Sequence, residues 1–458
     1  MRISVIGCGY LGAVHAAAMA ELGHQVVGVD IDQAKVADLA AGRPPFYEPG
    51  LTRLLRDGLD SGRLAFTDSL AAAAQGASVH FICVGTPQAA DSLEADLTAL
   101  HIAAEALVPL LEPGAVVVGK STVPVGTARP LAARLADASA HLVWNPEFLR
   151  EGHAVADTLS PDRIVYGLAE APGAAGAGAE DACGSGFGSA AAAAVLDQVY
   201  APLLAGGAPR LKMSFESAEL VKASANSYLA LRVSFINAIS DLADSAGADI
   251  LDVAAALRLD ERIGRRFLNP GLGYGGGCLP KDMHALTARA EQLGAPLTAA
   301  LLATADQINV SRRVRVVELT QRALGGPVAG SRLAVLGLAF KPMSDDVRNS
   351  QAVLVAEALA AAGAQVTATD PQAVASARAS HPALGYADSV AEAVRDAQAL
   401  LVLTEWPEYR ELDPARVAEW TAAREVVDAR AALDAPAWAK AGWTVRSPGR
   451  PPVVPSKS

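Results

Sequence analysis

A strand, a glycine turn, a helix and a second strand open the chain, and this order restricts its fold more than any other feature. The apolar run RISVI leads into Gly7, Gly9 and Gly12 in G-x-G-x-x-G spacing, and a helical stretch leads on to QVVGVD, which ends at Asp30. Such glycines allow a tight turn and a close backbone approach, so a pyrophosphate can bind at the helix N-terminus. A carboxylate at that place binds a ribose 2′-hydroxyl and repels a 2′-phosphate. The pattern predicts NAD binding; a glycine turn needed only for packing is the alternative.

Further apolar, β-type runs follow at 78–85, 115–122 and 141–148, separated by helical Ala- and Leu-rich stretches. This alternation is typical of a doubly wound parallel sheet. Hydrophobic residues make up 51% of the chain but aromatic residues only 5%, which fits buried strands and a core of Ala, Val and Leu. A chain of 458 residues is too long for one core, so two or three domains are expected.

The opening unit has an internal repeat near the C-terminus. RLAVLGLAFKP and ALAAAGAQVTATD repeat the strand, turn, helix and strand of the first unit and end at Asp370, as the first copy ends at Asp30. The second turn has Gly337 but not the G-x-G-x-x-G spacing, which indicates a Rossmann-type domain with a different ligand. An amphipathic pattern over 213–247 predicts one long helix, and helical sequence continues to Leu324.

The predicted fold class is therefore α/β, with two Rossmann-like doubly wound parallel-sheet domains joined by a central helical domain. The predicted boundaries are 1–212, 213–325 and 326–458. Residues 169–194 are Gly- and Ala-rich and are expected to form a surface loop leading into a helix, with an incidental Cys183.

Charge and cysteine usage exclude several classes of partner. The net charge of −11 argues against nucleic acid or an anionic membrane as a partner. No apolar stretch is long enough for a membrane span, and the run before Gly7 is too short for a signal peptide. The four cysteines lie far apart without a C-x-x-C pair, so neither a disulfide framework nor a metal site is expected. A reducing cytoplasm is the expected location.

A second candidate site is the segment GLGYGGGCLPKD at 271–282. Its glycines bring bare backbone close to a neighbour, and Cys278 follows them at once. Pro280 suits the first turn of a helix, so the thiol should lie at or just before a helix N-terminus. The partial positive charge there and Lys281 would stabilise a thiolate, and Asp282 adds a carboxylate. The alternative is a buried cysteine beside a structural loop.

Two further groups of polar residues have suggestive spacings. Lys222 and Asn226 lie four residues apart on the long helix and share a face that could stabilise an oxyanion, or that is merely solvated. In NPEFLREG (145–152), Asn145 is a plausible N-cap, and Glu147 and Glu151 would then share a helix face, where carboxylates are often only dipole partners.

Three other segments lie where open sheets gather ligand groups. Ser121 and Thr122 end one predicted strand, and the turn with Thr86 ends another. Lys341 begins a charged loop at the strand-to-helix turn of the second unit, where it would bind a diphosphate unless the loop is only solvated.

Together these segments resemble the nucleotide-sugar dehydrogenases of the UDP-glucose/GDP-mannose type, and among them the UDP-glucose 6-dehydrogenases most. The resemblance covers Met1 to Asp434 except 169–194. It is carried by GCGYLG (7–12), RPPFYEPGL (43–51), VGTP (84–87), KSTVPVGT (120–127), NPEFLREG (145–152), PDRIV (161–165), AELVK (218–222) with Asn226, the stretch DERIGRRFLNPGLGYGGGCLPKD (260–282), FKPMSDDVR (340–348) and TEW (404–406).

The resemblance implies an NAD domain, a central domain that forms a homodimer and a UDP domain, with UDP-glucose as substrate. It implies these catalytic residues: Cys278 as nucleophile, Lys222 and Asn226 at oxyanions, Lys222 and Asp282 in proton movement, and Thr122 and Glu147 at the hydrolytic water. For NAD it points to Gly7, Gly9, Tyr10, Leu11, Gly12, Asp30, Lys35, Thr86, Thr122, Glu151, Lys281 and Arg348. For the substrate it points to Glu147, Phe148, Leu149, Arg150, Glu151, Lys222, Asn226, Phe267, Leu268, Asn269, Pro270, Gly271, Gly275 and Lys341, with Arg262 reaching a neighbouring subunit's ligand.

Three positions depart from the family pattern. A Glu is common where this chain has Ala238, a small Ser or Ala where it has Gly277, and an Asn where it has Ala431. None of them is assigned to chemistry.

The implied reaction removes two hydrides from C6, with capture of the aldehyde by Cys278 as a thiohemiacetal, oxidation to a thioester and cleavage by water. Alternatives are a dehydrogenase of GDP-mannose or a UDP-N-acetylhexosamine, a two-electron hydroxyacid dehydrogenase, and a non-catalytic NAD-binding regulator. The last two leave Cys278 without a use.

Overall fold

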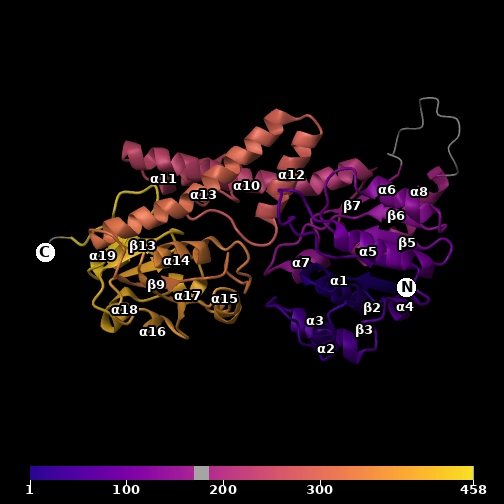
Figure 1. The fold of residues 1–458 in the computed structure, drawn as a ribbon, viewed down its shortest axis with the longest axis horizontal. Coiled ribbons are helices and arrows are strands. Elements are labelled where there is room, and N and C mark those ends of the chain that lie inside the picture. The colour runs from indigo at the N-terminus through magenta and orange to yellow at the C-terminus, as the bar shows by residue number, and fades with distance from the viewer. Residues whose placement is uncertain (170–184, 457–458) are drawn as a thin grey trace. The chain divides into compact units, whose positions relative to one another are not determined.

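Two β-sheets, one from each end of the sequence, organise the computed structural model, which describes residues 1–169 and 185–456 (Figure 1). The chain packs as two units. The first comprises residues 1–225 and 284–293, and the second comprises 226–283 and 294–458. The predicted α/β class with two Rossmann-like sheets is confirmed. The predicted division into three domains at 212/213 and 325/326 stays a prediction.

The first unit contains an eight-stranded sheet in the order β3-β2-β1-β4-β5-β6-β7-β8. All neighbouring strands are parallel except β6 and β7, which pair antiparallel. The strands are β1 (Arg2–Ile6), β2 (Gln25–Val29), β3 (Leu64–Thr67), β4 (Val79–Ile82), β5 (Val116–Gly119), β6 (His141–Trp144), β7 (Ile164–Leu168) and β8 (Arg210–Ser214). The helices are α1 (Tyr10–Glu21), α2 (Gln33–Ala40), α3 (Leu51–Asp60), α4 (Leu70–Ala74), α5 (Thr98–Leu107), the 3-10 helix η1 (Val108–Leu110), α6 (Ala128–Ala136), α7 (Ala154–Leu159), α8 (Ser185–Val199) and α9 (Ala201–Ala205).

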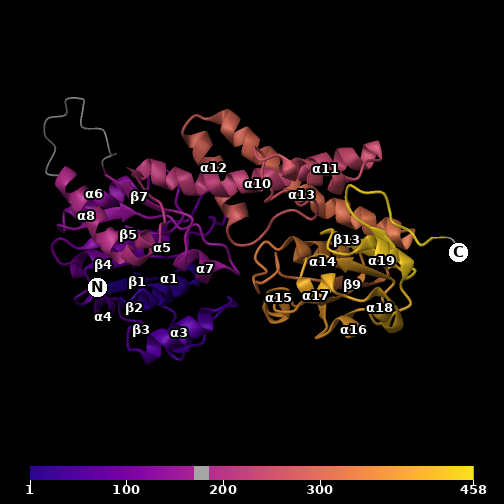
Figure 2. The same ribbon diagram turned by 180° about the vertical axis from the view of Figure 1, so that it is seen from behind.

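Alternation along the strands explains why helices cover both faces of this sheet (Figure 2). Successive side chains of a strand point to opposite faces. In β5, Val116 and Val118 pack in one apolar core with α1, α3 and α7, whereas Val117 packs in a second core with α5 and α6. The strand is therefore apolar throughout, as expected for a parallel strand buried on both sides.

The second unit contains a six-stranded parallel sheet in the order β11-β10-β9-β12-β13-β14. Its strands are β9 (Arg332–Leu336), β10 (Gln365–Thr369), β11 (Gly385–Tyr386), β12 (Ala399–Val402), β13 (Glu425–Asp428) and β14 (Thr444–Arg446). Its helices are α14 (Gln351–Ala361), α15 (Val374–Ser380), α16 (Val390–Ala393), α17 (Pro407–Arg410), α18 (Pro414–Trp420) and α19 (Ala435–Lys440).

Four helices lie between the two sheets in sequence, namely α10 (Phe215–Ala246), α11 (Ile250–Leu259), α12 (Leu279–Gln292) and α13 (Pro296–Leu324). The long helix predicted over 213–247 is present as Phe215–Ala246, with Met213 and Ser214 in β8 instead, and helical structure ends at Leu324 as predicted. Gly325 terminates α13 in the left-handed region, with φ +68°, where glycine carries no steric penalty. Both α10 and α12 cross the boundary between the units, α10 after Ala225 and α12 after Met283.

The predicted repeat is confirmed by matching hydrogen bonds in the two turns. Gly7 N donates to Val29 O and Gly337 N donates to Thr369 O, each at 2.8 Å. The next amide in each turn donates to the carboxylate that ends the second strand, Asp30 at 2.8 Å in the first unit and Asp370 at 2.7 Å in the second. Both turns therefore have the same backbone geometry, and their ligand chemistry depends on the side chains around each turn.

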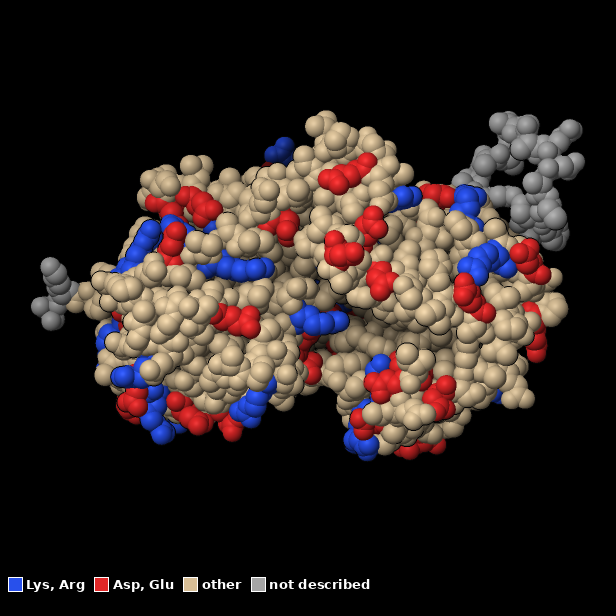
Figure 3. Space-filling model, in the orientation of Figure 1, with Lys and Arg blue, Asp and Glu red and all other residues tan. Residues whose placement is uncertain are grey.

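Residues 170–184, which include Cys183 and most of the predicted surface loop, lie outside the described residues. The helix predicted after this loop is present as α8. Within the described chain, no helix is long and apolar enough to cross a membrane, and no group of His, Cys, Asp and Glu has the arrangement of a metal site. On the described surface in Figure 3, acidic and basic side chains are interspersed.

Candidate active site

The three glycines of the first turn meet different surroundings, and these surroundings fit a bound dinucleotide. A Cβ on Gly7 would lie 2.9 Å from the Val84 side chain, and φ there is +87°, which favours glycine. A Cβ on Gly12 would lie 1.8 Å from the Gly7 carbonyl oxygen, so this glycine is required for close packing of α1 on β1. At Gly9, no described atom lies within 4 Å of the Cβ position. Gly9 also begins α1 without a side-chain cap, so bare backbone faces open space at a helix N-terminus.

Asp30 lies at the end of β2 and is partly committed to the turn. Its Oδ2 accepts from Cys8 N at 2.8 Å and its Oδ1 accepts from Asp32 N at 3.0 Å. The Lys35 amine on α2 lies 3.1 Å from both oxygens. The carboxylate is thus oriented by backbone and balanced by a half-buried cation, which suits recognition of a ribose diol.

The corresponding carboxylate of the second turn is fully engaged. Asp370 Oδ2 accepts from Leu338 N, Ala339 N and the Trp406 indole, and Oδ1 accepts from Gln372 N and from the next amide. A carboxylate with five donors has no lone pair left for a ribose. The second turn therefore has the backbone of the first but offers no free carboxylate lone pair to a ribose.

The NPEFLREG segment is not helical, and this corrects the prediction that Asn145 caps a helix there. Helix α7 begins only at Ala154. The Asn145 side chain is buried and links β7 to the residue after β5, because its Nδ2 donates to Val165 O at 2.8 Å and its Oδ1 accepts from the Lys120 amine at 3.0 Å. Glu147 Oε2 accepts from Leu149 N at 2.5 Å, which turns the backbone locally. These bonds replace helical ones, so Glu147 and Glu151 do not share a helix face.

Glu147 and Lys222 form a buried ion pair, with Lys222 Nζ 2.9 Å from Glu147 Oε1. Burial favours the neutral acid, but the Lys222 charge and the bond from Leu149 N outweigh it and hold the pKa of Glu147 below its usual value. The Lys222 ammonium also lies 5.8 Å above the Phe148 ring, which the Arg163 guanidinium covers at 3.7 Å. The Lys222 side chain is therefore buried among charged and aromatic partners and does not lie on a solvated helix face.

A second buried lysine lies in the same unit. Lys120 Nζ donates to Asn145 Oδ1 at 3.0 Å and lies 3.5 Å from the Tyr200 hydroxyl, which itself donates to Asn145 Oδ1 at 2.6 Å. The rings of Phe81 and Tyr200 each lie 6.0 Å from the amine. Burial lowers the pKa of Lys120 from 10.5 to about 8.

The KSTVPVGT segment follows β5 and is held against the loop after β4. Thr86 Oγ1 donates to Thr122 O at 2.6 Å, and Ser121 Oγ donates to Val84 O at 2.7 Å. The structure thus brings together the ends of two neighbouring strands, as the sequence predicts for ligand-binding residues of an open sheet.

Cys278 differs from the other described cysteines in exposure. It is exposed directly before α12, as predicted from Pro280, which lies in the first turn of that helix. Cys8 and Cys83 are buried, and burial raises the pKa of Cys8 far above its usual range and that of Cys83 to about 12. Both buried thiols are therefore held protonated, which leaves Cys278 as the accessible thiol of the described chain.

Polar side chains of the second unit hold the glycine loop before Cys278. The loop accepts from Arg312 Nε at Gly271 O (3.1 Å) and from Arg430 Nη1 at Gly273 O (2.8 Å). Asn309 bonds both backbone groups of Tyr274, to N at 2.8 Å and to O at 3.0 Å. A Cβ on Gly275 would lie 2.3 Å from Asn349 O, so the backbone approach requires glycine.

The other predicted residues beside Cys278 form one chain of contacts in the second unit. Asp282 is buried; its Oδ2 accepts from Asn226 Nδ2 at 2.6 Å and its Oδ1 pairs with Lys281 Nζ at 2.6 Å. Each oxygen of this buried carboxylate therefore has a polar partner, an amide on one and an ammonium on the other.

The substrate-loop residues lie mostly after α11. Phe267 has a positive φ of +60°, Leu268 is buried and Asn269 accepts from Arg258. Arg262 is 90% exposed and pairs with Asp260 at 2.6 Å, so this cation is presented to solvent at the surface of the unit.

Two departures from the family pattern have visible steric consequences. A Cβ on Gly277 would lie 2.5 Å from the Arg348 guanidinium carbon, so glycine leaves room for this side chain, which pairs with Asp346 at 2.7 Å. Ala431 has φ +50°, a left-handed conformation that costs about 1 kcal/mol for alanine and that asparagine adopts more readily. Ala238 is half-buried on α10, and nothing in the structure explains it.

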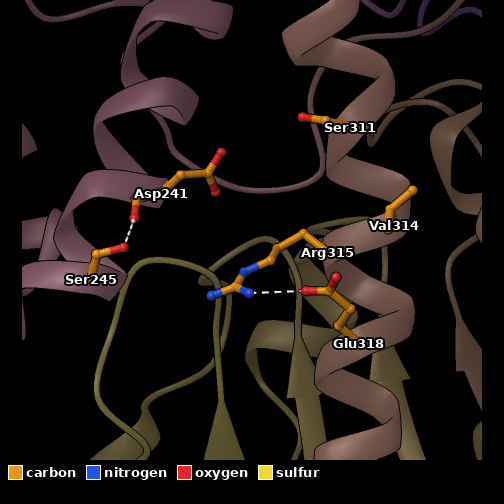
Figure 4. Close-up of a pocket in the computed structure, with 6 residues that line it drawn as sticks. All are labelled: Asp241, Ser245, Ser311, Val314, Arg315 and Glu318. Carbon is orange, nitrogen blue, oxygen red and sulfur yellow. Dashed lines mark hydrogen bonds and ion pairs between the residues drawn. The ribbon is translucent and has the colours of Figure 1, made fainter.

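A hollow of about 400 Å³ between α10 and α13 contains none of these residues (Figure 4). Arg315 in its wall is paired with Asp244 at 2.5 Å and with Glu318 at 2.9 Å. Asp241 pairs with the buried Arg312, which holds the glycine loop. The acidic and basic groups in the wall of the hollow are thus paired with charged neighbours, and one of these pairs supports the glycine loop before Cys278 through Arg312.

Sequence reasoning missed Lys120 and two buried glutamates, Glu48 and Glu219. Glu48 accepts from Gly152 N at 2.7 Å, from Ala154 N at 2.8 Å and from the Tyr10 hydroxyl. Both glutamates lie inside motifs of the resemblance, and Glu219 precedes Lys222 by one helical turn. Their places inside these motifs could have identified the two glutamates as candidate site residues.

Comparisons with known proteins agree along the whole chain. Three profiles of the UDP-glucose/GDP-mannose dehydrogenase family match in order: its NAD binding domain at residues 1–179, its central domain at 216–311 and its UDP binding domain at 334–435. The UDP-glucose 6-dehydrogenase of Rhizobium meliloti (strain 1021) is 40% identical, over 98% of this chain and 100% of its own. A solved UDP-glucose dehydrogenase from Pyrobaculum islandicum is 38% identical, with a TM-score of 0.82, over 94% of this chain and 96% of its own. A UDP-D-ManNAc dehydrogenase from Pyrococcus horikoshii is 25% identical, with a TM-score of 0.83, over 98% and 99%.

Proposed function

The chain belongs to the UDP-glucose/GDP-mannose dehydrogenase family of NAD-dependent oxidoreductases, and from this premise we propose that it oxidises UDP-glucose to UDP-glucuronate. The overall reaction converts the C6 alcohol, two NAD⁺ and one water into a carboxylate, two NADH and three protons. The identity to UDP-glucose 6-dehydrogenases, at 38% to 40%, supports this substrate over that of the 25% identical UDP-D-ManNAc enzyme.

The exposure of Cys278 is the observation that carries the proposed mechanism. It is the one described cysteine in contact with solvent, and it lies at the N-terminus of a fourteen-residue helix. The positive end of the helix dipole favours a thiolate. An aldehyde intermediate needs a nucleophile of this kind if it is to remain bound while the reduced cofactor is exchanged.

Bound NAD supplies the acceptor for both hydrides. In the first oxidation, the C6 hydroxyl loses its proton through the Lys222 and Asp282 side chains, which pass it to solvent. The Cys278 sulfur then adds to the aldehyde carbon, and Lys222 and Asn226 stabilise the oxyanion of the thiohemiacetal. Loss of the second hydride leaves a thioester on Cys278.

Thr122 and Glu147 hold the water that cleaves this thioester. Water oxygen bonds to the acyl carbon, the carbon–sulfur bond breaks with its electron pair on sulfur, and the water proton passes to Glu147. The pKa of Glu147 lies below its usual range, so the group is ready as a carboxylate and acts as an acceptor rather than an acid.

For binding, we assign Gly7–Gly12, Asp30, Lys35, Thr86, Thr122, Glu151, Lys281 and Arg348 to NAD. We assign residues 147–151, Lys222, Asn226, residues 267–271, Gly275 and Lys341 to the sugar nucleotide, with Arg262 serving a neighbouring subunit. The fully engaged Asp370 supports a different ligand for the second turn, because a dinucleotide ribose finds no free acceptor there.

A homodimer is part of the proposal. Helix α10 exposes Tyr228, Phe235 and Leu242 at seven-residue intervals, which places three large apolar side chains on one face. Such a strip suits a second copy of the helix, and mass measured in solution by light scattering tests it. We also place the enzyme in the cytoplasm, in keeping with the lack of a disulfide among the described cysteines.

Counting NADH against a panel of sugar nucleotides tests the function. We expect two NADH per UDP-glucose and none with GDP-mannose or a UDP-N-acetylhexosamine.

Cys278→Ala should bind NAD normally and form no acid, because no thioester can form, whereas Cys83→Ala should remain active. Acid production by Cys278→Ala at the normal rate would exclude the covalent route. Absence of NADH with every sugar nucleotide would favour a regulatory protein.

A further inference from the structure

Glu219 is a buried carboxylate to which the proposed chemistry assigns no role. It lies on α10, is 1% exposed and accepts two backbone hydrogen bonds, from Gly126 N at 2.7 Å and from Ala128 N at 2.6 Å. These amides belong to the end of KSTVPVGT and the start of α6. Each carboxylate oxygen therefore fixes one amide of the segment that carries Thr122.

The same turn of α10 also carries Lys222, three residues further on, which pairs with Glu147 at 2.9 Å. One helical turn thus bonds to both segments that hold the hydrolytic water in the proposed mechanism. Glu219 fixes the segment of Thr122, and Lys222 fixes Glu147. Side chains at i and i+3 lie on one face of a helix, so both bonds share one rigid support.

Contacts with other elements also hold the Thr122 segment, among them the bond from Ser121 Oγ to Val84 O described above. Arg289 Nε on α12 donates to Val125 O at 2.8 Å, and Thr86 Oγ1 donates to Thr122 O at 2.6 Å. The segment is thus fixed at Thr122, at Val125 and, through Glu219, at Gly126. Among these contacts, Glu219 alone comes from the helix that carries Lys222.

We propose that Glu219 is a positioning residue for thioester hydrolysis, because it holds Thr122 at a set distance from the Glu147–Lys222 pair. This inference rests on the proposed function. Formation of the thioester uses the side chains of Cys278, Lys222, Asn226 and Asp282. Thr122 enters that stage only as one of several residues assigned to NAD, and saturating NAD compensates for a weakened contact there. Loss of the Glu219 bonds should therefore slow the last step and leave both hydride transfers intact.

The chemistry of the contact explains why a carboxylate is needed. Two N–H donors approach the two oxygens, and both oxygens accept. In Glu219→Gln, the amide oxygen can accept from one donor, but the amide nitrogen faces the other N–H as a second donor. The backbone of Gly126 or Ala128 then loses its partner, and the segment is released at one end.

The test is a rapid-quench turnover with saturating UDP-glucose and NAD. We expect Glu219→Gln to produce a burst of two NADH per active subunit at the rate of the parent enzyme, followed by steady turnover slowed about 10- to 100-fold, the range of a lost positioning contact. Mass spectrometry of the quenched protein should show the acyl adduct on Cys278. Glu219→Asp, which keeps two acceptors, should restore part of the hydrolysis rate.

The control is Asp413→Asn, which alters a carboxylate cap on α18 of the second unit and should leave burst and steady rate unchanged. If Glu219→Gln does not fold, Arg289→Met releases the same segment at Val125 and should give the same burst. A fall in burst rate equal to the fall in steady rate, or hydrolysis at the parent rate, overturns the positioning role. Absence of any adduct and of a second NADH in the parent enzyme overturns the proposed function instead.

Discussion

At the scale of single residues, Gly9 and Gly12 show that the same residue type is required for two separable reasons. At Gly12, the missing Cβ is required by the fold, since it would lie 1.8 Å from the Gly7 carbonyl oxygen. At Gly9, φ is −67° and the Cβ direction is open, so the fold tolerates alanine. Glycine at position 9 leaves space for a ligand. A substitution there can therefore lower the affinity for the cofactor without lowering the stability of the fold.

We expect Gly9→Ala to keep its stability within about 0.5 kcal/mol while its NAD affinity falls at least about tenfold, since a methyl group stands where pyrophosphate approaches. Gly12→Ala should instead lose about 3 kcal/mol or more, because backbone atoms must move apart. Urea unfolding and calorimetric NAD titration of both variants measure the two effects. Unchanged NAD binding by Gly9→Ala would contradict the assignment of this turn to the cofactor.

Lys120 makes a pH-dependent contribution to stability that follows from its burial. Its pKa is about 8 in the folded chain and ordinarily 10.5, so between these values the unfolded chain binds more protons. Stability carried by this group therefore rises with pH across the window, and the cost of burying the charge is fully present below pH 8.

In Lys120→Met this cost is absent, and the Tyr200 hydroxyl still donates to Asn145 Oδ1. The unfolding free energy of the variant, relative to the parent, should therefore decrease by about 2 kcal/mol between pH 8 and pH 10, at about 1.4 kcal/mol per pKa unit. Denaturant unfolding at several pH values measures this difference. Lys440→Met, which removes an exposed lysine at the end of α19, is the control. A difference that does not change with pH in Lys120→Met would refute a buried, titrating amine.

At the scale of elements, local patterns predicted what local interactions determine. The units β1-α1-β2 and β9-α14-β10 follow from strand runs, glycine turns and a terminal Asp, all within short stretches of sequence. The long helix α10 and the start of α12 at Leu279 follow from helical periodicity and from Pro280. In each case neighbours in sequence supply the deciding bonds, so no knowledge of the tertiary fold is needed.

The remaining site contacts depend on partners far away in sequence. The NPEFLREG segment looks like a helix start, but Asn145 is bonded to Lys120, 25 residues earlier, and to Val165, 20 residues later. Glu219 accepts from amides 93 and 91 residues away. Such bonds override local propensity, and only the folded sheet reveals which strands bring them together.

The two Asp residues that end β2 and β10 show the same distinction. Both are predicted by the repeat, and both accept from the turn after the preceding strand. Only the structure shows that Trp406 and four amides occupy every lone pair of Asp370, whereas Asp30 faces Lys35. The repeated backbone could be predicted from the sequence. The full engagement of Asp370 could not, because it depends in part on Trp406, which lies 36 positions away.

At the scale of the whole molecule, the chain has two units, each with its own sheet and its own apolar cores. Core residues of the first sheet do not take part in the core of the second in the described structure. A ligand that binds one folded unit stabilises that unit by mass action, by about 2.7 kcal/mol at one hundred times its Kd. The glycine turn assigned to NAD follows β1, and Lys341, assigned to the sugar nucleotide, follows β9. Each ligand should therefore protect most strongly the sheet that carries its turn.

Hydrogen–deuterium exchange measures this division directly. With NAD alone at one hundred times its Kd, amides of β1, β4 and β5 should exchange up to about 100-fold more slowly, while those of β9 and β12 should slow much less. UDP alone should give the reverse pattern, because the turn after β9 is assigned to the nucleotide. Variant Gly9→Ala should lose the first protection and keep the second. Equal protection of both sheets by either ligand would mean that the chain opens as one cooperative body, since exchange in each sheet would then report the same unfolding event.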